Sequence, residues 1–581
     1  MQSNQGTESR GGAVSKLVTT EQMRALEAAA VEAGVSEASL MAEAGLAAAQ
    51  EAWMAVGAMA ERGILFLVGP GNNGSDALVA ARELSQWGGV PFVYLLRTRA
   101  ADDSVWQEFV KTELPYLVAA DDDPTFERLE GLLAEASAIV DGLLGIGANY
   151  LERPIQGELA EVLTRVAAAR LRITPAQVLA LDVPTGVDAD SGFADPLAVR
   201  ADITVTFGFA KVGLYSIPGN EYAGRVVPVE IGLPNDVADE LPYEELRLRD
   251  LKSVMPERPA DANKGTFGTV TIAAGSKRYP GAARLAAEAA ARSGAGLVQL
   301  AAPEVIQALL VHGLPDVIHE PLASSEGALN SEAARALLRA LNGGRSTALL
   351  VGPGLSLTTG TQGFVRELVG GLNGIQSLEA LVLDADALNA MAAEPEWWIR
   401  LEIPRVLTPH PAEMARLTGT SVEAVQSDRL GSAARFAKLT GSVVVLKGAC
   451  TVVAGPDGRA RLSDAANAML ATAGTGDVLA GLIAGLLAQG MTPYDAASTA
   501  VYLHSDMGRR VAESHGTAAG LAQDLLKVLP DARRLLESGS SMASSSMPNF
   551  GGISGRGGTV GSGMTGLGDG LPSGLGGPPG F

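Results

Sequence analysis

The sequence predicts an α/β protein of two domains, each with a parallel sheet enclosed by helices. At 581 residues the chain is too long for one ordinary hydrophobic core. In both halves, short aliphatic runs alternate with helix-like stretches, the pattern of parallel strands joined by crossover helices. Between the halves, around residues 232–265, the apolar runs stop and prolines and charges take over.

The first half opens with a predicted helix over Thr19–Gly34, where Thr19 and Gln22 have the spacing of a capping box. Five apolar runs then predict strands, at 64–68, 92–96, 138–145, 178–184 and 203–209. We expect a flexible leader over residues 1–15, a first domain over 16–245 and a linker over 246–262.

The second half carries six strand-like runs, at 268–275, 296–303, 347–354, 380–388, 405–413 and 442–453. Long helical stretches follow from Gly476 to about Leu536, so the second domain is predicted over 263–537. Residues 538–581 are rich in Gly, Ser, Met and Pro and cannot bury enough apolar surface to fold. They are predicted to form a disordered low-complexity tail or a contact tail.

Composition limits the class of partner. A formal net charge of −21 argues against a nucleic-acid ligand. No uncharged apolar segment reaches the roughly 18 residues of a membrane span, and the first residues lack a signal-peptide core. The single cysteine, Cys450, lies in an apolar run, where a buried structural thiol is expected. These features predict a soluble cytoplasmic protein with no membrane or nucleic-acid partner.

Three polar turns follow three apolar runs of the first half: GNNGSD (71–76), DGLLGIG (141–147) and DVPTGVD (182–188). In a parallel sheet they converge at the carboxyl ends of the strands, where such sheets bind ligands. Asn and Asp oxygens suit a cation, and Gly71 and Gly74 let backbone N–H groups approach an anion. Gly69, Gly71 and Gly74 have the G-x-G-x-x-G spacing of dinucleotide-binding turns. Taken alone, this spacing is weak evidence for a ligand, and a merely structural turn is the alternative.

The string AGTGD in the second half predicts a phosphoryl-transfer site. Gly474 and Gly476 open a helix whose exposed N–H groups stabilise a developing anion, and Asp477 can accept a proton from a hydroxyl. Phosphoryl transfer to an alcohol needs both. The alternative is a capping aspartate with glycines for packing. The segment KGACT, Lys447–Thr451, is typical of an adenine pocket.

The strings VGPGNNGSDALVAAREL, IVDGLLGIG, LALDVPTGVDADSG and VTFGFAKVGLY, with SLMAEAG before them, resemble the epimerase domain of bifunctional NAD(P)H-hydrate repair enzymes. The resemblance implies a Rossmann-like fold that binds hydrated NAD(P)H and a potassium ion and interconverts the R and S forms at the hydrated ring carbon. Ser75 and Ala77 replace glycines of the family pattern, and Thr185 replaces a serine.

The family's roles transfer by motif position. The resemblance implies substrate contacts from Asn72, Asn73, Gly74, Ser75, Asp76, Gly145, Ile146, Gly147, Ala148, Asn149, Tyr150, Leu151 and Asp182. It places the potassium ion on Asn73, Asp141 and Thr185. Lys211 is a candidate catalytic group, with a solvated surface lysine as the alternative.

The second half resembles the ribokinase-like superfamily and, more narrowly, the NAD(P)H-hydrate dehydratase domain. The resemblance rests on a series of strings along residues 263–490, of which the first begins NKGTFGTVTIAAG and the last is GTGDVLAGLIAGLLAQG. Ala473 stands where the family often has glycine. It implies that a magnesium-bound ADP or ATP phosphorylates the ring hydroxyl of the S hydrate, and that loss of phosphate restores NAD(P)H.

In that domain the resemblance assigns Asp477 as catalytic base and substrate contact. Substrate contacts are also implied for Ala282, Gly354 and His410, and nucleotide contacts for Lys447, Gly448, Ala449, Cys450, Thr451 and Gly476. His410 lies between prolines, where one structural hydrogen bond is the alternative. Asp384 and Asp386 either position the magnesium-bound phosphate or cap the next helix.

The sequence therefore predicts a bifunctional repair enzyme that forms a homo-oligomer. A second hypothesis is a ribokinase-like kinase for a vitamin precursor whose first domain is not catalytic. A third is an interaction scaffold with a disused pocket in the first domain. The preference for ADP or ATP, and for NADHX or NADPHX, stays open.

Overall fold

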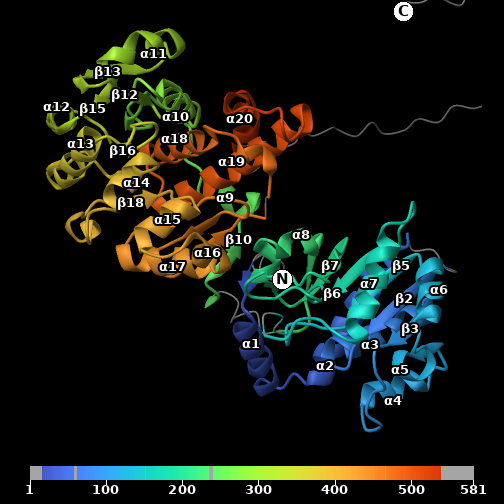
Figure 1. Ribbon diagram of the computed structural model, residues 1–581. Coiled ribbons are helices and arrows are strands. Elements are labelled where there is room, and N and C mark those ends of the chain that lie inside the picture. Colours follow the sequence, from blue (N-terminus) through green and yellow to red (C-terminus); the bar gives the residue numbers. More distant parts are fainter. Residues whose placement is uncertain are drawn as a thin grey trace, which may run out of the picture. The chain divides into compact units, whose positions relative to one another are not determined.

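The computed structural model describes residues 16–57, 62–148, 150, 152–233, 240–464 and 466–537 (Figure 1). The predicted leader and tail lie outside these ranges. The described chain builds two largely parallel sheets flanked by helices, so the predicted α/β class is confirmed.

The first sheet has seven parallel strands in the order β4-β3-β2-β5-β6-β7-β9. The strands are β2 (Gly63–Val68), β3 (Val90–Leu95), β4 (Tyr116–Val118), β5 (Ala138–Gly142), β6 (Gln177–Leu181), β7 (Ile203–Phe207) and β9 (Arg225–Val229). The accompanying helices are α1 (Thr20–Glu32), α2 (Glu37–Ala55), α3 (Asn72–Gln86), α4 (Ser104–Val110), α5 (Ala119–Asp122), α6 (Glu127–Glu135), α7 (Glu158–Arg170) and α8 (Gly219–Ala223), with a 3-10 turn at Val212–Tyr215.

Both faces of this sheet are covered, as the continuous apolar runs predict. In β2, Phe66 and Val68 pack into a core that includes residues of α1, α2 and α3. The alternate residues Leu65 and Leu67 pack into a second core with residues of α6 and α7. Successive side chains of a strand point to opposite faces, so one apolar run serves two layers of helix.

The strand order reverses between β2 and β5. The chain leaves β2 for β3 and β4 on one side and then returns to place β5 on the other side of β2. Parallel sheets bind ligands at such a switch point, outside the carboxyl ends of the strands. The turns after β2 and β5, singled out by sequence, both lie there.

The second sheet has twelve strands in the order β13-β12-β11-β16-β17-β18-β19-β20-β21-β10-β1-β8. Seven parallel strands form its larger part: β11 (Thr269–Ala273), β12 (Leu297–Pro303), β13 (Ile318–Leu322), β16 (Ala348–Val351), β17 (Ala380–Leu383), β18 (Arg405–Leu407) and β19 (Val443–Leu446). Then follow the antiparallel β20 (Val452–Ala454) and β21 (Ala460–Leu462). A separate small hairpin joins β14 (Ser324–Ser325) and β15 (Ala328–Leu329).

Helices enclose this sheet on two faces as well. One core contains residues of α10 (Pro280–Arg292), α18 (Thr475–Ala488), α19 (Pro493–His515) and α20 (Ala522–Glu537). The other contains residues of α12 (Ser331–Gly343), α13 (Thr359–Gly370), α14 (Asp386–Met391), α15 (Pro411–Thr418), α16 (Val422–Ser427) and α17 (Arg429–Thr440). The remaining helices are α9 (Leu248–Lys252) and α11 (Gln307–Gly313), with 3-10 turns at Glu304–Ile306, Leu372–Gly374, Trp397–Arg400 and Ala468–Ala471.

Three very short strands extend the second sheet: β10 (Tyr243–Glu245), β1 (Lys16–Val18) and β8 (Ala210–Lys211). The predicted first domain, 16–245, contains all three, yet β10 pairs with β21. The predicted linker, 246–262, contains α9, and Leu246 and Leu251 are buried in a core of the second sheet. The segment between the two halves is therefore more ordered than a simple linker, and the domain boundaries themselves stay predictions.

Local sequence signals match the helices well. Thr19 and Gln22 form the predicted capping box of α1. The long helical stretch near the C-terminus is α18, α19 and α20. GNNGSD differs from a simple turn, because α3 begins at Asn72 and Asn72–Asp76 make its first turn. Among the described helices, none combines the length and apolarity needed to cross a bilayer.

Candidate active sites

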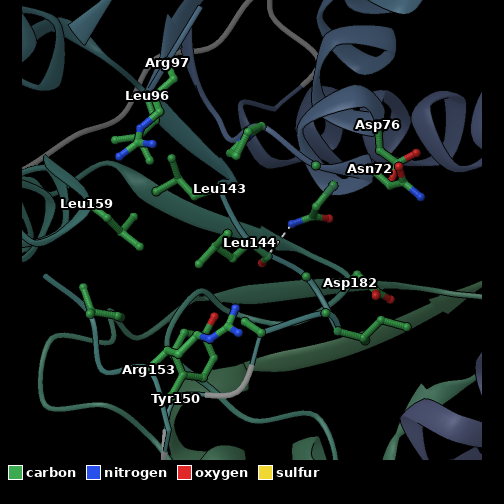
Figure 2. A pocket seen from close by; sticks show the side chains of 18 of the residues that line it. Asn72, Asp76, Leu96, Arg97, Leu143, Leu144, Tyr150, Arg153, Leu159 and Asp182 are labelled. Carbon is green, nitrogen blue, oxygen red and sulfur yellow. Dashed lines mark hydrogen bonds between the residues drawn. The ribbon is translucent and has the colours of Figure 1, made fainter. Parts of the chain in front are cut away.

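A cavity of about 1080 Å³ lies at the switch point of the first sheet. Figure 2 shows residues that line it, with Asp76 and Asp182 on one side of the view and Arg97 and Arg153 on the other. Of the residues predicted to contact substrate, the cavity is lined by Asn72, Asn73, Asp76, Gly145, Ile146, Gly147, Ala148, Tyr150 and Asp182. The motifs therefore converge, and Asn149 and Leu151 lie outside the described residues.

The three predicted cation ligands gather beside this cavity. Asp141, at the end of β5, accepts hydrogen bonds from the Thr185 hydroxyl at 2.7 Å and the Thr185 backbone N–H at 2.9 Å. Asn73 donates through Nδ2 to the Leu144 carbonyl at 3.1 Å, which fixes its amide. The buried Oδ1 of Asn73 has no hydrogen-bond partner among the described residues. An unpartnered amide oxygen near a buried carboxylate and a hydroxyl suits a hard cation.

Asp182 directly follows β6 in an uncommon backbone conformation, with a φ of 65°. Its carboxylate forms an ion pair with Lys211, which is fully buried. The Lys211 ammonium also donates to the Phe207 carbonyl at 2.9 Å and the Thr206 hydroxyl at 3.2 Å. Lys211 is thus no solvated surface residue. It lies behind Asp182 and is not among the residues that line the cavity.

Two further carboxyl groups lie near this pair. Burial raises the pKa of Asp76 well above its usual value, and the nearby Asp182 and Glu27 carboxylates raise it further. Burial likewise raises the pKa of Glu27, a residue of α1 that lines the cavity. Both groups therefore hold protons to a higher pH than ordinary carboxyls, which suits proton transfer.

Gly74 and Ser75, also predicted to contact substrate, are not among the lining residues. A Cβ on Gly74 would lie 2.0 Å from the Gly69 carbonyl oxygen, so this position needs glycine for close packing. The buried Ser75 hydroxyl accepts a hydrogen bond from Arg99 at 2.7 Å. Both residues thus shape the turn from beneath the cavity.

A second group of polar side chains lies at the carboxyl ends of β17, β18 and β19. Lys447, directly after β19, forms an ion pair with the buried Asp384 at 2.6 Å. Asp384 also accepts from the Thr408 hydroxyl at 2.6 Å. The Asp384 side chain makes no capping hydrogen bond at the start of α14. Asp386 accepts a hydrogen bond from the Ser356 backbone N–H at 2.8 Å. The helix-capping alternative for Asp384 is therefore wrong.

Asp477 lies in the first turn of α18 close to this group. A Cβ on Gly476 would lie 3.6 Å from the Lys447 ammonium, so Lys447 reaches the start of the helix. Burial raises the pKa of Asp477 to about 7; the Asp384 and Asp386 carboxylates raise it and Lys447 opposes them. A carboxyl that titrates near neutrality is suited to general-base work.

His410 has the structural role that sequence reasoning offered as its alternative. It is the N-cap of α15, and its Nδ1 accepts from the backbone N–H groups of Ala412 and Glu413. Its Nε2 lies 3.2 Å from the Glu413 carboxylate. The side chain is half-exposed, so capping leaves part of the ring accessible.

The other predicted residues of this half fall into two places. Ala282 and Gly354 lie together, because a Cβ on Gly354 would lie 2.7 Å from that of Ala282. The turn after Lys447 consists of Gly448, Ala449, Cys450 and Thr451. In it, the Thr451 hydroxyl donates a hydrogen bond to the Gly448 carbonyl. Cys450 is buried as predicted, and burial raises its thiol pKa to about 12, so only its backbone is suited to contact a nucleotide.

Several residues near the two sites escaped sequence reasoning. Glu27 lies one turn from Met23 on the face of α1 that buries Met23 and Ala30, and this position was a usable signal. Glu413 was visible only as a helix residue after His410. His504 lies in α19 and contacts the Thr475 carbonyl at 2.9 Å; burial lowers its pKa to about 4. Nothing in the local sequence predicts this long-range contact.

Comparison with known proteins matches both halves. Residues 37–213 match a family model described as YjeF-related protein N-terminus, and residues 270–531 match one described as NAD(P)H-hydrate dehydratase. The bifunctional NAD(P)H-hydrate repair enzyme Nnr of Moorella thermoacetica is 37% identical over 83% of this chain and 89% of its own length. The chain belongs to the family of bifunctional NAD(P)H-hydrate repair enzymes.

Another member of the NAD(P)H-hydrate repair family, from Salinibacter ruber, is 36% identical over 88% of this chain and 95% of its own length. Among solved structures, the ADP/ATP-dependent NAD(P)H-hydrate dehydratase of Bacillus subtilis, co-crystallised with ATP and Mg²⁺, is 33% identical. The match covers 50% of this chain and 98% of that one, with a TM-score of 0.44.

Proposed function

We propose that this protein repairs hydrated nicotinamide cofactors with two sites on one chain. The first site epimerises R- and S-NAD(P)HX, and the second dehydrates S-NAD(P)HX to NAD(P)H at the expense of ADP or ATP. The observation that carries the proposal is family membership along both halves of the chain. Each half also gathers its motif residues at the carboxyl ends of parallel strands, where such sheets bind ligands.

At the first site, inversion at the hydrated ring carbon requires the bond from that carbon to its hydroxyl oxygen to break and re-form on the other face. We assign Asp76 to donate the proton with which the oxygen leaves as water and to take it back on return. Its raised pKa supports this role. Asp182 binds the substrate, and Lys211 is a positioning residue that neutralises Asp182 from behind.

A potassium ion fits the oxygen set of Asn73, Asp141 and Thr185, because the buried Asn73 Oδ1 has no other partner among the described residues. When bound, the ion supplies fixed positive charge beside the substrate. The loop Gly145–Ala148 and Tyr150 would then cover the phosphate side of the dinucleotide. Gly74 and Ser75 contribute to the turn itself.

At the second site, Asp477 takes the proton of the substrate hydroxyl while the oxygen attacks the terminal phosphorus of the nucleotide. The bond from that phosphorus to the bridging oxygen breaks, and AMP leaves from ADP or ADP from ATP. The phosphate ester then breaks, releasing inorganic phosphate, and loss of a proton from the adjacent ring carbon restores the ring of NAD(P)H. Hydroxide is a poor leaving group and phosphate a good one. The exposed N–H groups at the start of α18 stabilise the transferring phosphoryl group.

Around this step, Lys447 and the turn Gly448–Thr451, with Gly476, would hold the adenine nucleotide. Ala282, Gly354 and the exposed part of His410 would line the substrate pocket. Magnesium would be held by the two carboxylates that follow β17, Asp384 and Asp386, both of which act on the Asp477 carboxyl. When bound, magnesium neutralises phosphate charge. A homo-oligomer in the cytoplasm stays a prediction, as does the absence of nucleic-acid and membrane partners.

Turnover of each hydrate with ADP or ATP tests the proposal. We expect S-NADHX with either nucleotide to recover NADH absorbance, and R-NADHX to follow through the epimerase site. A stable phosphorylated product without NADH would instead support a ribokinase-like kinase. Unchanged R-hydrate turnover in an Asp141→Ala variant would contradict the epimerase assignment and favour a disused first pocket.

A further inference from the structure

Arg99, on the segment after β3, contacts the glycine turn from beneath the cavity. Its NH1 donates to the Gly69 carbonyl at 2.8 Å and more weakly to the Gly71 carbonyl at 3.4 Å. Its NH2 donates to the Ser75 hydroxyl at 2.7 Å. One guanidinium therefore bonds to the strand exit and to the first turn of α3, on both sides of Asn72 and Asn73.

The guanidinium is itself held in place. Its Nε donates to the Asp103 carboxylate at 2.6 Å, and the Arg99 side chain is only 6% exposed. Asp103 is the N-cap of α4 and accepts from the backbone N–H groups of Val105 and Trp106. Although burial raises the pKa of Asp103, those N–H groups and Arg99 lower it on balance. A buried guanidinium that donates through all three of its nitrogens is a rigid support.

The turn leaves little room for movement. A Cβ on Gly74 would lie 3.0 Å from Arg99 NH1 and 2.0 Å from the Gly69 carbonyl oxygen. The guanidinium thus packs against the surface that glycine leaves open. Asn73 and Asp76 belong to the same helical turn as Gly74 and Ser75, and their side chains face the cavity.

We propose that Arg99 is a positioning residue of the epimerase site. Through Gly69 and Ser75 it fixes the first turn of α3, so that the Asn73 amide oxygen and the Asp76 carboxyl stay aimed at cation and substrate. The proposal rests on the proposed epimerase function. Arg99 touches neither ligand, and its effect reaches the reaction only through the turn.

The test is steady-state epimerisation of R-NADHX by the full-length Arg99→Gln and Ser75→Ala variants. We expect kcat to fall about 10- to 100-fold in Arg99→Gln and several-fold in Ser75→Ala, and the half-saturating potassium concentration to rise in both. The two changes should be non-additive in the double variant, because they break one shared bond. Arg99→Lys should restore part of the rate.

Two internal controls separate positioning from general loss of structure. Dehydration of S-NADHX by the second site of the same chain should stay unchanged in every variant. Arg170→Gln removes a comparable pair, since Arg170 bonds to both Asp202 carboxylate oxygens at 2.6 and 2.8 Å near the amino ends of β6 and β7. It should lower the melting temperature without altering the kcat or potassium dependence of epimerisation.

Wild-type kcat and potassium dependence in Arg99→Gln would overturn the proposal. So would equal losses of epimerisation in Arg99→Gln and Arg170→Gln. Failure of the wild-type chain to epimerise either hydrate would overturn the proposed epimerase function and this inference together. A wild-type chain that epimerises, with an Arg99→Gln variant that does so equally well, would overturn this inference alone.

Discussion

Each site contains a lysine paired with an aspartate at the end of a parallel strand. Lys211 pairs with Asp182 after β6, and Lys447 pairs with Asp384 after β17. A buried charge is tolerated only when it is compensated, so each pair constrains the geometry of its site. The pairs differ in that Lys211 lies behind the cavity, whereas Lys447 lies near the carboxyl of Asp477, the proposed base.

Lys211→Met should destabilise the first domain and stop epimerisation. The change leaves Asp182 buried without its counter-charge, which costs about 3–5 kcal/mol in comparable pairs. Urea unfolding followed by circular dichroism measures the loss. The double variant Lys211→Met with Asp182→Asn should regain most of the stability and none of the activity. Wild-type stability in the single variant would contradict the ion-pair interpretation.

The dehydratase should show an acid limb near neutral pH. Asp477 must be ionised to accept a proton, and its pKa of about 7 means that kcat for S-NADHX falls roughly tenfold per pH unit below that value. Asp477→Asn should lower kcat by about 10²- to 10⁴-fold. A rate that stays flat between pH 5 and 8 would rule out Asp477 as the base.

The buried Asp477 carboxyl should also lower the free energy of unfolding once the pH rises above its pKa. Because the folded pKa, about 7, lies above the ordinary value of 3.8, the folded chain binds the proton more tightly than the unfolded chain. Stability from this group is complete below pH 3.8 and is lost as the pH rises through 7. Asp477→Asn should therefore gain roughly 1–3 kcal/mol at pH 8. Equal stability gains at pH 4 and pH 8 would contradict the shift.

At the scale of elements, helix packing in the second domain depends on small residues. A Cβ on Gly481 of α18 would lie 2.2 Å from the Ala286 carbonyl oxygen of α10, and one on Gly485 would lie 2.0 Å from the Ser293 hydroxyl. The close approach lets α18 present its first turn, with Asp477, to the active site. The same principle applies in the first domain, where Gly45 lets α2 pack against Val79 of α3.

Gly481→Ala should destabilise the protein by about 1–3 kcal/mol, because the obstructing atoms belong to backbone and cannot rotate away. Gly281→Ala in α10 is the matched control, since its new methyl group would meet nothing within 4 Å. It should be neutral or add up to about 1 kcal/mol through helix propensity. Thermal unfolding compares them, and equal melting temperatures would refute the packing argument.

Elements with a clear period were predictable, and so was the convergence of their ends. The runs around Phe66 and Leu350 predicted buried strands because every residue in them is apolar. Polar residues that come directly after such runs could then be placed at the carboxyl ends of the strands, where the sites lie. The short strand at Lys16 was not predictable, since three residues carry no period. Glu27 and Arg99 were missed because their partners are distant in sequence, and backbone carbonyls such as that of Gly69 leave no compositional trace.

At the scale of the whole molecule, one chain carries two sites whose proposed reactions follow one another. The S hydrate released by the first site is the substrate of the second. The proposed key residues are separate: Asp141 belongs to β5 of the first sheet, and Asp477 belongs to the first turn of α18, which packs on the second sheet. Either reaction should therefore be removable by itself.

A mixture of Asp141→Ala and Asp477→Asn chains should convert R-NADHX to NADH with added nucleotide, although neither variant does so alone. The first chain supplies dehydration and the second supplies epimerisation, with the S hydrate diffusing between them. NADH absorbance follows the reaction. An inactive mixture, with each variant retaining its own remaining activity, would mean that the intermediate does not leave the chain on which it forms.

The strand β10 also limits where the chain can be cut. It lies between β21 and β1 in the second sheet, so β21 has β10 as its outer neighbour. A fragment that begins at residue 263 would lose β10 and α9, so the outer edge of β21 and the part of the core filled by Leu246 and Leu251 would both be uncovered. A fragment that begins at residue 240 leaves β10 as its outer edge but keeps β21 paired and that core filled, so protein dissection and any natural splitting of the two activities should favour breakpoints before β10.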